Sequence, residues 1–333
     1  MTVMNASCHP AVQEVSSPQA MAKRPVVSVL TITYNHEPFL AECIESVLAQ
    51  ETGFEVEMVI GEDASPDGTR RLCREFQRRY PDRIRLVLPD ANLGRHLNFK
   101  HTFEACRGTY IALLEGDDYW TDRHKLRKQV ELLNSHPEWV MCFHNVRIVG
   151  ECREGRAPVF YEQPGKPVFT QRDFVERNFV PTCSCLFRSG LARLPAWYYD
   201  ADRNPYTDWV LHVLNAAHGD IGYSHEIMAA HRSHGGGVWG RTFDGSVAGD
   251  IRRMTDRITT LDRLEECMGA EFRGPLRRQR AQDCFHLALS YRERGDWPRV
   301  RRSLFQALRA DPFAGPPLLR SLLIACVPML RRT

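Results

Sequence analysis

The first half of the chain repeats one pattern, an apolar strand followed by an amphipathic helix, and this pattern restricts the fold more than any other feature. The run Val26–Thr33 is rich in β-branched residues and almost continuously apolar, which is typical of a parallel strand covered on both faces. Apolar residues then recur at helical spacing between Phe39 and Leu48, in a segment that begins near Pro38. This alternation predicts an α/β fold, with a mainly parallel sheet and right-handed crossover helices.

The same periodicities predict the other elements of this domain. We expect strands at residues 56–60, 84–88, 110–114, 139–149 and 183–188, and helices at residues 67–80, 97–106, 123–134, 174–179 and 209–217. The segment 150–167 contains Gly and Pro and is predicted to be a loop or hairpin excursion.

From about residue 246 the strand pattern ends and only helical periodicity remains. Residues 281–312 resemble one tetratricopeptide-type helix–turn–helix, with Gly295 at the turn and Pro312 after the second helix. Because stacked repeats normally need about three units, we interpret this hairpin as a helical cap, with binding of a protein partner or oligomerisation as the alternative. The predicted organisation is a flexible tail (1–24), an α/β domain (25–245) and a helical C-terminal region (246–333).

Charge and cysteine usage exclude two classes of function. The 44 basic and 41 acidic residues leave a formal net charge of +3, so the chain has no global field suited to binding nucleic acid. The 11 Cys are odd in number and form no pair of C-x-x-C elements, which argues against a zinc cage and for reduced thiols in a cytoplasmic protein.

No apolar run reaches the roughly 20 residues that a membrane-spanning helix needs. The residues before Arg24 also lack the basic and apolar regions of a secretory signal. The most apolar stretch, 316–330, is interrupted by Arg320 and Pro328. We therefore expect a cytoplasmic protein, with peripheral contact at the inner membrane face as the remaining membrane hypothesis.

Polar residues follow the first two predicted strands. Thr33, Tyr34 and Asn35 come after the first strand, and Glu62 and Asp63 come after the second. Because ligands of α/β sheets bind beyond the carboxyl ends of the strands, these residues are candidates for a nucleotide pocket. An Asp accepts a ring N–H of a base and a Tyr ring stacks on it. The alternative interpretation is an ordinary polar turn and helix cap.

Two adjacent carboxylates, Asp117 and Asp118, end the apolar strand 110–114. Burying such a pair without a cation is unfavourable, because each charge raises the pKa of the other group. Mg²⁺ or Mn²⁺ binds one or two protein carboxylates and fills its other positions with water and phosphate oxygens, which suits a diphosphate ligand. The alternative is a solvated acidic turn.

Two later segments carry further candidates. Asp208 is predicted at the start of a helix, where it serves either as a general base or as an N-cap. In the segment His231–Gly237, Arg232 and His234 are candidates for contacts with a departing diphosphate, and His234 is also a candidate metal ligand. A solvent-facing or structural histidine is the alternative.

These residues, taken together, resemble the family-2 inverting glycosyltransferases of the GT-A fold, over residues 25–239. The similar motifs are Val26–Asn35, Glu62–Thr69 (the family's D-D-x-S-x-D-x-T, with Glu62 in place of the first Asp), Asn92–Gly94, Gly116–Asp118, Asp208 and Arg232–His234. The family's usual acidic residue before the base is Thr207 here.

The resemblance implies a role for each matching position. Asp63 would contact the nucleotide base, with Asn92 near the donor; Asp117 would approach the ribose or metal, and Asp118 would bind the metal. Asp208 would be the catalytic base and Arg232 would approach the pyrophosphate.

The predicted function is therefore transfer of a sugar, with inversion, from a nucleotide-diphosphate donor, UDP-linked by preference, to a glycan, lipid-linked or other hydroxyl acceptor. The predicted cofactor is Mn²⁺ or Mg²⁺, and synthesis of a cell-surface polysaccharide or glycan is the expected setting. Two rivals remain, a nucleotidyltransferase and a catalytically silent nucleotide-binding scaffold that acts through its helical region.

Overall fold

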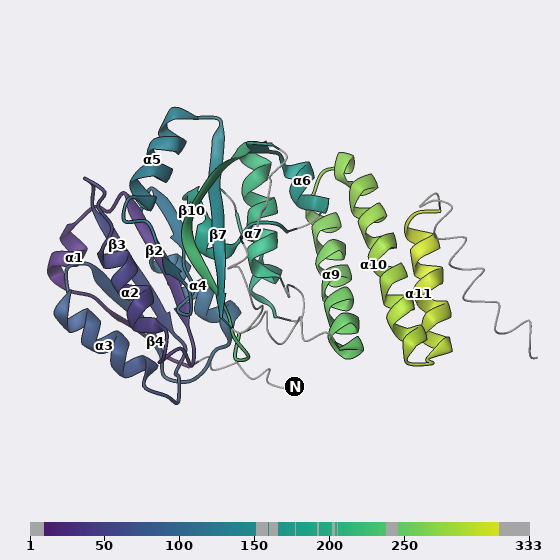
Figure 1. Cartoon of the computed structure of the whole chain (residues 1–333), viewed down its shortest axis with the longest axis horizontal. Helices are drawn as coiled ribbons and strands as arrows, with labels where there is room; N and C mark the ends of the chain where they lie inside the picture. Colours follow the sequence, from purple (N-terminus) through teal and green to yellow (C-terminus); the bar gives the residue numbers. More distant parts are fainter. Residues whose placement is uncertain are drawn as a thin grey trace, which may run out of the picture. The chain divides into compact units, whose positions relative to one another are not determined.

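The computed structural model describes residues 10–150, 159, 166–176, 178–191, 193–201, 204, 206–237 and 246–312 (Figure 1). The chain divides into two compact units. The first comprises Met1–Thr170, Val180–Arg193 and Leu214–Arg232, and the second comprises Gln171–Phe179, Leu194–Val213 and Ser233–Thr333. The boundary predicted between residues 245 and 246 therefore falls inside the second unit.

The first unit is an α/β structure, as the alternating pattern predicts. Its strands are β1 (Val12–Val15), β2 (Val27–Thr33), β3 (Val56–Glu62), β4 (Ile84–Pro89), β5 (Tyr110–Leu113), β6 (Tyr119–Trp120), β7 (Trp139–Gly150), β8 (Val168–Phe169), β9 (Leu186–Arg188) and β10 (Asp220–Ser233). Its helices are α1 (Pro18–Ala22), α2 (Leu40–Leu48), α3 (Thr69–Arg79), α4 (Arg95–Ala105) and α5 (Lys125–Ser135), with short 3₁₀ helices at Thr182–Ser184 and Ala216–His218.

The described strands form one mixed sheet in the order β1-β4-β3-β2-β5-β9-β7-β10-β6, with β8 paired to β10. The segment β4-β3-β2-β5 is parallel, and Thr33 of β2 is in register with Glu62 of β3. Strands β9, β6 and β8 pair antiparallel with their neighbours. The carboxyl ends of the parallel strands consequently meet at one edge, where the predicted nucleotide residues lie.

Buried apolar residues from β2, β3, β4 and β5 form the main core, together with the inward faces of α2, α3 and α5. Helix α4 lies directly on β3. A Cβ built on Gly61 would come within 1.9 Å of Thr102 Oγ1, and Asn98 Nδ2 donates a hydrogen bond of 2.9 Å to the Gly61 carbonyl. Gly61 thus permits the close approach of the helix that follows the loop 92–94.

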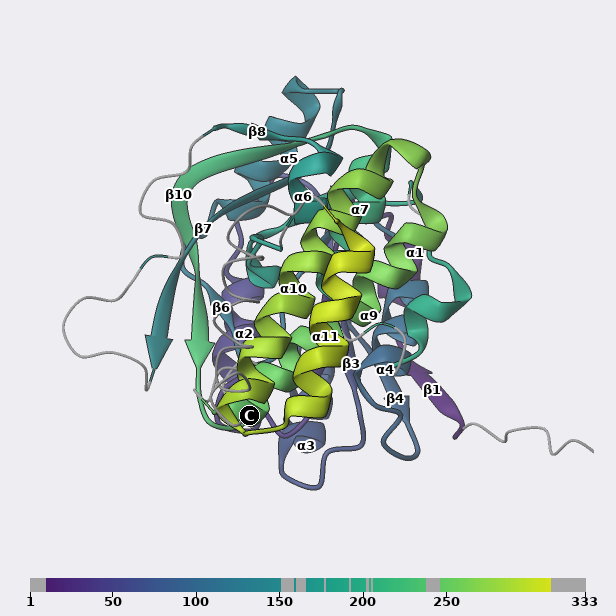
Figure 2. The ribbon, with the colours of Figure 1, turned by 90° about the vertical axis from the view of Figure 1, so that its right-hand side faces the viewer.

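The flexible tail predicted at residues 1–24 is wrong for residues 12–22. Strand β1 pairs antiparallel with β4, from Val12 opposite Pro89 to Val15 opposite Leu86 (Figure 2). Ser17 caps α1 by accepting a hydrogen bond from the Ala20 N–H at 3.0 Å. The hydrogen bonds to β4 stabilise this short segment as a strand, which it would not form on its own.

The region after residue 217 also differs from the sequence-based expectation, because it contains the long strand β10. Figure 2 shows β7 and β10 side by side, and the two are neighbours in the sheet. Residues Ala229 and Ala230 of β10 pair with β6, and His231 and Arg232 follow directly after them. The predicted strand 183–188 is shorter than expected, since residues 182–184 form a 3₁₀ turn.

The second unit is helical in its described part. It contains α6 (Gln171–Glu176), the 3₁₀ helix Ala196–Tyr199, α7 (Thr207–Asn215) up to Val213, α9 (Val247–Cys267), the 3₁₀ helix Ala270–Phe272, α10 (Arg273–Glu293) and α11 (Trp297–Ala310). The predicted hairpin at residues 281–312 is confirmed: α10 and α11 pack through Ala288, Val300 and Leu304, and Gly295 at φ +70° forms the turn.

Among the described helices, none combines the length and the apolar character needed to cross a bilayer. The apolar stretch 316–330, Trp239, and most of the loop 150–167 lie outside the described residues.

Candidate functional site

The loops after β2 and β3 are joined by two hydrogen bonds, one between backbone groups and one from a backbone N–H to a side chain. The Asp63 N–H donates to the Thr33 carbonyl at 3.2 Å, and the Asn35 N–H donates to Ser65 Oγ at 3.0 Å. Asn35 has φ +57°, a conformation that Asn adopts more readily than most residues. Tyr34 is exposed. Its ring is therefore available to a ligand at this edge of the sheet.

Asp63 is buried and fixes the loop that follows β4. Its Oδ1 accepts a hydrogen bond of 2.7 Å from the Leu93 N–H, and its carbonyl accepts one of 3.0 Å from Asn92 Nδ2. Burial raises the pKa of the Asp63 carboxyl, which the backbone hydrogen bonds from Leu93 and Gly94 oppose. The structure thus brings together Asp63 and Asn92, which are 29 residues apart in the chain.

Glu62 has a structural role at the position where the family motif has Asp. Its carboxylate is fully buried, pairs with Arg70 and accepts a hydrogen bond of 2.7 Å from the Ser65 N–H. Arg70 also donates to the Pro89 carbonyl at 2.7 Å. This ion pair connects the ends of β3 and β4.

Asp67 and Thr69 hold the loop after β2 in place. The His36 N–H donates to Thr69 Oγ1 at 3.0 Å, and the Glu37 N–H donates to Asp67 Oδ2 at 3.2 Å. In return, Glu37 Oε2 accepts a hydrogen bond of 2.8 Å from the Gly68 N–H. The D-x-T part of the motif therefore orders the backbone beside the candidate site.

The turn that carries Asp117 and Asp118 lies close against the loop after β2. The Gly116 N–H donates to the Ile32 carbonyl at 3.1 Å, and a Cβ at Gly116 would be 2.5 Å from Thr33 Oγ1. Only glycine fits this approach without displacing Thr33. The side chain of Asp117 is 17% exposed, and its Oδ2 lies 3.7 Å from His36 Nε2.

Asp118 is buried and holds the end of β10. Its Oδ2 lies 3.0 Å from His231 Nδ1, and its Oδ1 accepts a hydrogen bond of 2.8 Å from the Arg232 N–H. Burial disfavours the charged form of His231, but the Asp118 carboxylate outweighs this effect and raises the pKa of the imidazole to about 9. Without a bound cation, the charge of Asp118 is therefore balanced by an imidazolium.

The Arg232 guanidinium is engaged by the protein itself. It donates to the Asp117 carbonyl at 2.5 Å, forms an ion pair with Glu42, and lies 4.4 Å from the centre of the Tyr119 ring and 5.2 Å from that of Phe39. These contacts place Arg232 on the turn of the two carboxylates, where it stabilises the turn. Its predicted contact with a pyrophosphate remains a prediction.

Sequence reasoning missed Cys183 and His231 as partners of Asp118. One ligand atom from each of the three residues lies within 4.8 Å of the other two. The only sequence signal for His231 was its place directly before the R-x-H element, and Cys183 appeared as one of several core thiols. His234 belongs to the second unit, so its metal bond stays a prediction.

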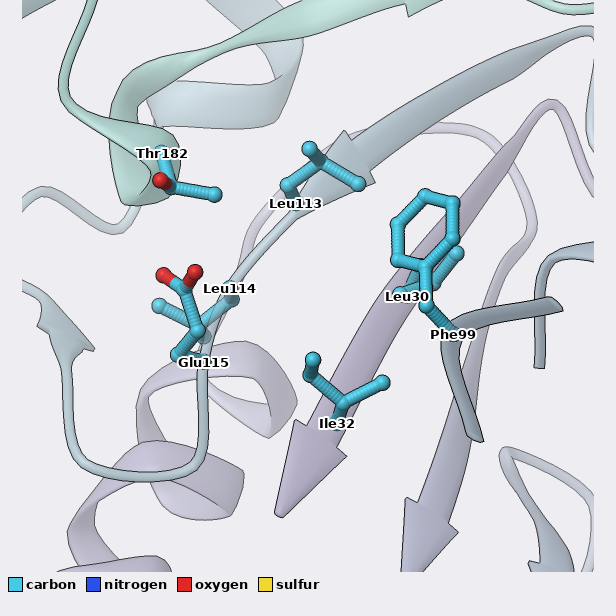
Figure 3. A pocket seen from close by; sticks show the side chains of 7 residues that line it. All are labelled: Leu30, Ile32, Phe99, Leu113, Leu114, Glu115 and Thr182. Atoms are coloured by element: carbon cyan, nitrogen blue, oxygen red, sulfur yellow. The ribbon is translucent and has the colours of Figure 1, made fainter. Parts of the chain in front are cut away.

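A small, mostly apolar pocket lies at the ends of β2 and β5. It is lined by Leu30, Ile32, Phe99, Leu113, Leu114, Glu115 and Thr182. Figure 3 shows the Glu115 carboxylate pointing toward Thr182, with Phe99 beside Leu30. It includes none of the predicted site residues.

Asp208 lies in the first turn of α7, in the second unit. Its Oδ2 accepts a hydrogen bond of 2.8 Å from Asn178 Nδ2. The start of α7 is anchored by Trp209, whose Nε1 donates to the Phe174 carbonyl at 2.6 Å, and by the Tyr198 hydroxyl, which donates to the Thr207 carbonyl at 3.1 Å.

Comparison with known proteins identifies relatives of the chain. The family description "Glycosyl transferase family 2" matches residues 28–194. The uncharacterized protein Rv1520 of Mycobacterium tuberculosis is 41% identical over 221 residues, which is 64% of this chain and 60% of the relative. The putative teichuronic acid biosynthesis glycosyltransferase TuaG of Bacillus subtilis is 34% identical over 110 residues, 33% of this chain and 42% of the relative. The chain thus spans 60% or less of the length of these relatives.

Two solved structures share the fold. The mannosyltransferase PcManGT from Pyrobaculum calidifontis, in complex with GDP-Man and Mn²⁺, has a TM-score of 0.54 and 18% identity, and the match covers 95% of this chain and 83% of that one. S. aureus TarS 1–349, in complex with UDP-GlcNAc, has a TM-score of 0.52 and 14% identity, covering 83% and 90%. At such identities the likeness establishes the fold alone. The chain belongs to glycosyl transferase family 2 and has the GT-A fold.

Proposed function

We propose that this protein transfers a sugar from a nucleotide-diphosphate donor to a hydroxyl acceptor with inversion at the anomeric carbon. The observation that carries the proposal is the arrangement of Asp63, Asp117 and Asp118 at the carboxyl edge of the parallel strands, beside the exposed Tyr34. In open α/β sheets this edge is where nucleotides bind.

The donor's nucleotide is proposed to lie across the loops after β2, β3 and β4. Tyr34 supplies a ring that stacks on the base, and Asp63 supplies an acceptor for a ring N–H. Thr33 and Asn35 shape the loop beneath the ribose, and Asn92 orients the Asp63 backbone through its 3.0 Å hydrogen bond. Asp117, the more exposed of the paired carboxylates, faces the donor.

The residues at the end of β5 fit a divalent cation. Two adjacent carboxylates are present, Asp117 with a 17% exposed side chain and Asp118 buried, and carboxylate oxygens are the ligands that these ions prefer. When bound, Mn²⁺ or Mg²⁺ would supply charge stabilisation for the departing diphosphate. Arg232, near the end of β10, holds the turn of the two carboxylates through its hydrogen bond to the Asp117 carbonyl. Its guanidinium also adds positive potential beside the two carboxylates.

Asp208 is proposed as the general base that accepts the proton of the acceptor hydroxyl. The hydrogen bond from Asn178 occupies its Oδ2, so Oδ1 remains the oxygen for the incoming proton. The buried Trp209 fixes the orientation of this turn of α7.

The relatives support a donor class and a setting. TarS is complexed with UDP-GlcNAc, PcManGT with GDP-Man and Mn²⁺, and TuaG is named for teichuronic acid biosynthesis. We therefore propose a UDP-linked donor first and a GDP-linked one second, and an acceptor in cell-surface polysaccharide synthesis.

A screen of nucleotide sugars tests the proposal. The purified full chain is incubated with UDP- and GDP-sugars, with and without Mn²⁺, and release of the nucleoside diphosphate is measured. Metal-dependent release from one donor class is the expected result. Tight, metal-independent nucleotide binding without release would favour the silent scaffold, and release of pyrophosphate from a nucleoside triphosphate would favour a nucleotidyltransferase.

A further inference from the structure

The buried side of Asp118 faces two donors that Mg²⁺ sites in proteins do not ordinarily use. Cys183 is fully buried, and its Sγ lies within 4.8 Å of a ligand atom of Asp118 and of one of His231. His231 Nδ1 lies 3.0 Å from Asp118 Oδ2 on the same carboxylate. The carboxylate comes from the turn after β5, the imidazole from the end of β10, and the thiol from the 3₁₀ helix at Thr182–Ser184. The three groups thus converge from separate parts of the chain.

The spacing of these donors suits a small tetrahedral ion. Zn²⁺ binds sulfur at about 2.3 Å and nitrogen or oxygen at about 2.0–2.2 Å, which puts its ligand atoms roughly 3.5 Å apart. The three donor atoms lie within 4.8 Å of one another, and the His231–Asp118 pair is already at 3.0 Å. Side-chain movements of about an ångström would bring the three donor atoms to the spacing that a tetrahedral Zn²⁺ requires.

The chemistry of the set selects a thiophilic ion. Thiolate and imidazole ligands favour Zn²⁺ and Co²⁺, whereas Mg²⁺ prefers an all-oxygen shell. Since the side chain of His231 is 23% exposed while the other two are buried, an ion reaches the set from the His231 side.

We propose that Asp118, Cys183 and His231 bind a single Zn²⁺-class ion through sulfur, nitrogen and oxygen, leaving one position open. The sulfur ligand is the new element. The binding follows from the three side chains alone and does not require the proposed sugar transfer.

Cobalt titration of the reduced, chelator-stripped full chain tests this proposal without any nucleotide. Co²⁺ is expected to give a thiolate-to-metal charge-transfer band and the intense visible bands of a tetrahedral ion, saturating at one ion per chain. Zn²⁺ should displace Co²⁺ and remove both features, whereas excess Mg²⁺ should not.

Three variants locate the site. Cys183→Ala should lose the charge-transfer band, and His231→Gln should keep it while weakening Co²⁺ binding by about ten- to a hundredfold. Cys267→Ala, which removes an exposed thiol in the second unit, should behave as the wild type. A folded wild type that gives no band, or a band that survives in Cys183→Ala, would overturn the proposal. Because no donor is present, this outcome is independent of whether the chain transfers a sugar.

Discussion

Asp118 organises the site through contacts that its neighbours in the sequence do not reveal. Its two oxygens bind His231 and the backbone of Arg232, which are 113 and 114 residues further along the chain. Replacing a buried carboxylate with this many partners leaves other polar groups unpaired. Asp117 is therefore the better position for testing a cation ligand without disturbing β10.

The role of Asp208 is tested by Asp208→Asn. The amide keeps the shape of the side chain and still accepts a hydrogen bond from Asn178, but it cannot accept the proton of the acceptor. Transfer is expected to fall by about a hundredfold to ten-thousandfold. Calorimetric binding of the nucleoside diphosphate should remain at the wild-type level.

Asp250→Asn serves as the matched control, because Asp250 is a surface carboxylate of the same unit, paired with Arg253 at 2.6 Å. This variant should transfer sugar at the wild-type rate. Full turnover in Asp208→Asn would remove Asp208 from the mechanism.

The buried Lys125 gives a pH-dependent prediction for stability. Its ammonium donates to Gln129 Oε1 at 2.6 Å and lies 4.1 Å from the centre of the Trp120 ring, and burial lowers its pKa from 10.5 to about 8. Between these two values the unfolded chain binds more protons than the folded one, so the stability of the wild type rises with pH in that window. Below pH 8 the buried charge costs on the order of 3 kcal/mol.

Lys125→Met removes this titration, so its stability relative to the wild type should decrease as the pH rises from 8 to 10.5, as measured by urea unfolding. Lys128→Met is the control on the same helix, because ion pairs with Asp122 and Glu226 raise rather than lower the pKa of Lys128. A pH-independent difference for Lys125→Met would show that the ammonium is not buried as described.

At the element scale, the sequence predicted best the strands whose residues are buried along their whole length. All residues of β3 and β4 are buried, so their apolar runs are unambiguous. Strand β10 was missed because its two buried stretches, Ile221–Tyr223 and Met228–Ala230, are separated by the more exposed segment 224–227, and neither a period of two nor a continuous apolar run results. Strand β1 forms only by pairing with β4, a contact that local sequence does not encode.

The candidate site divides in the same way. Residues at the ends of predictable strands, such as Thr33, Asp63 and Asp117, could be chosen as candidates from the sequence, and their roles stay predictions. The convergence of Cys183 and His231 on Asp118 depends on β9 and β10 entering the sheet out of sequence order, which no local pattern specifies.

The α10–α11 hairpin offers a test of its turn. Gly295 has φ +70° and nothing lies within 4 Å of a Cβ built there, so Gly295→Ala should destabilise the hairpin by about 1 kcal/mol or more through backbone strain alone. Gly274→Ala in the first turn of α10, where φ is helical and Arg278 gives way easily, should leave stability unchanged or slightly higher. Equal thermal unfolding temperatures for the two variants would contradict the assigned turn.

For the whole molecule, the family match at residues 28–194 covers the strands that hold the nucleotide and cation candidates, while Asp208, His234 and the α9–α11 helices lie beyond it. The first unit contains Tyr34, Asp63, Asp117 and Asp118 together. Donor binding is therefore the property that this unit should show most directly, whereas Asp208, the proposed base, belongs to the second unit.

The central claim is that a divalent cation at the Asp117–Asp118 turn binds a nucleoside diphosphate to this protein. Isothermal calorimetry of UDP and GDP, with and without Mn²⁺, measures it directly, using Asp117→Asn as the test variant and Asp82→Asn, which alters a surface ion pair with Lys23, as the control. One diphosphate should bind about tenfold or more tightly with Mn²⁺ in the wild type and in Asp82→Asn, and this gain should be lost in Asp117→Asn. Binding that ignores Mn²⁺, or a full Mn²⁺ effect in Asp117→Asn, would contradict the claim.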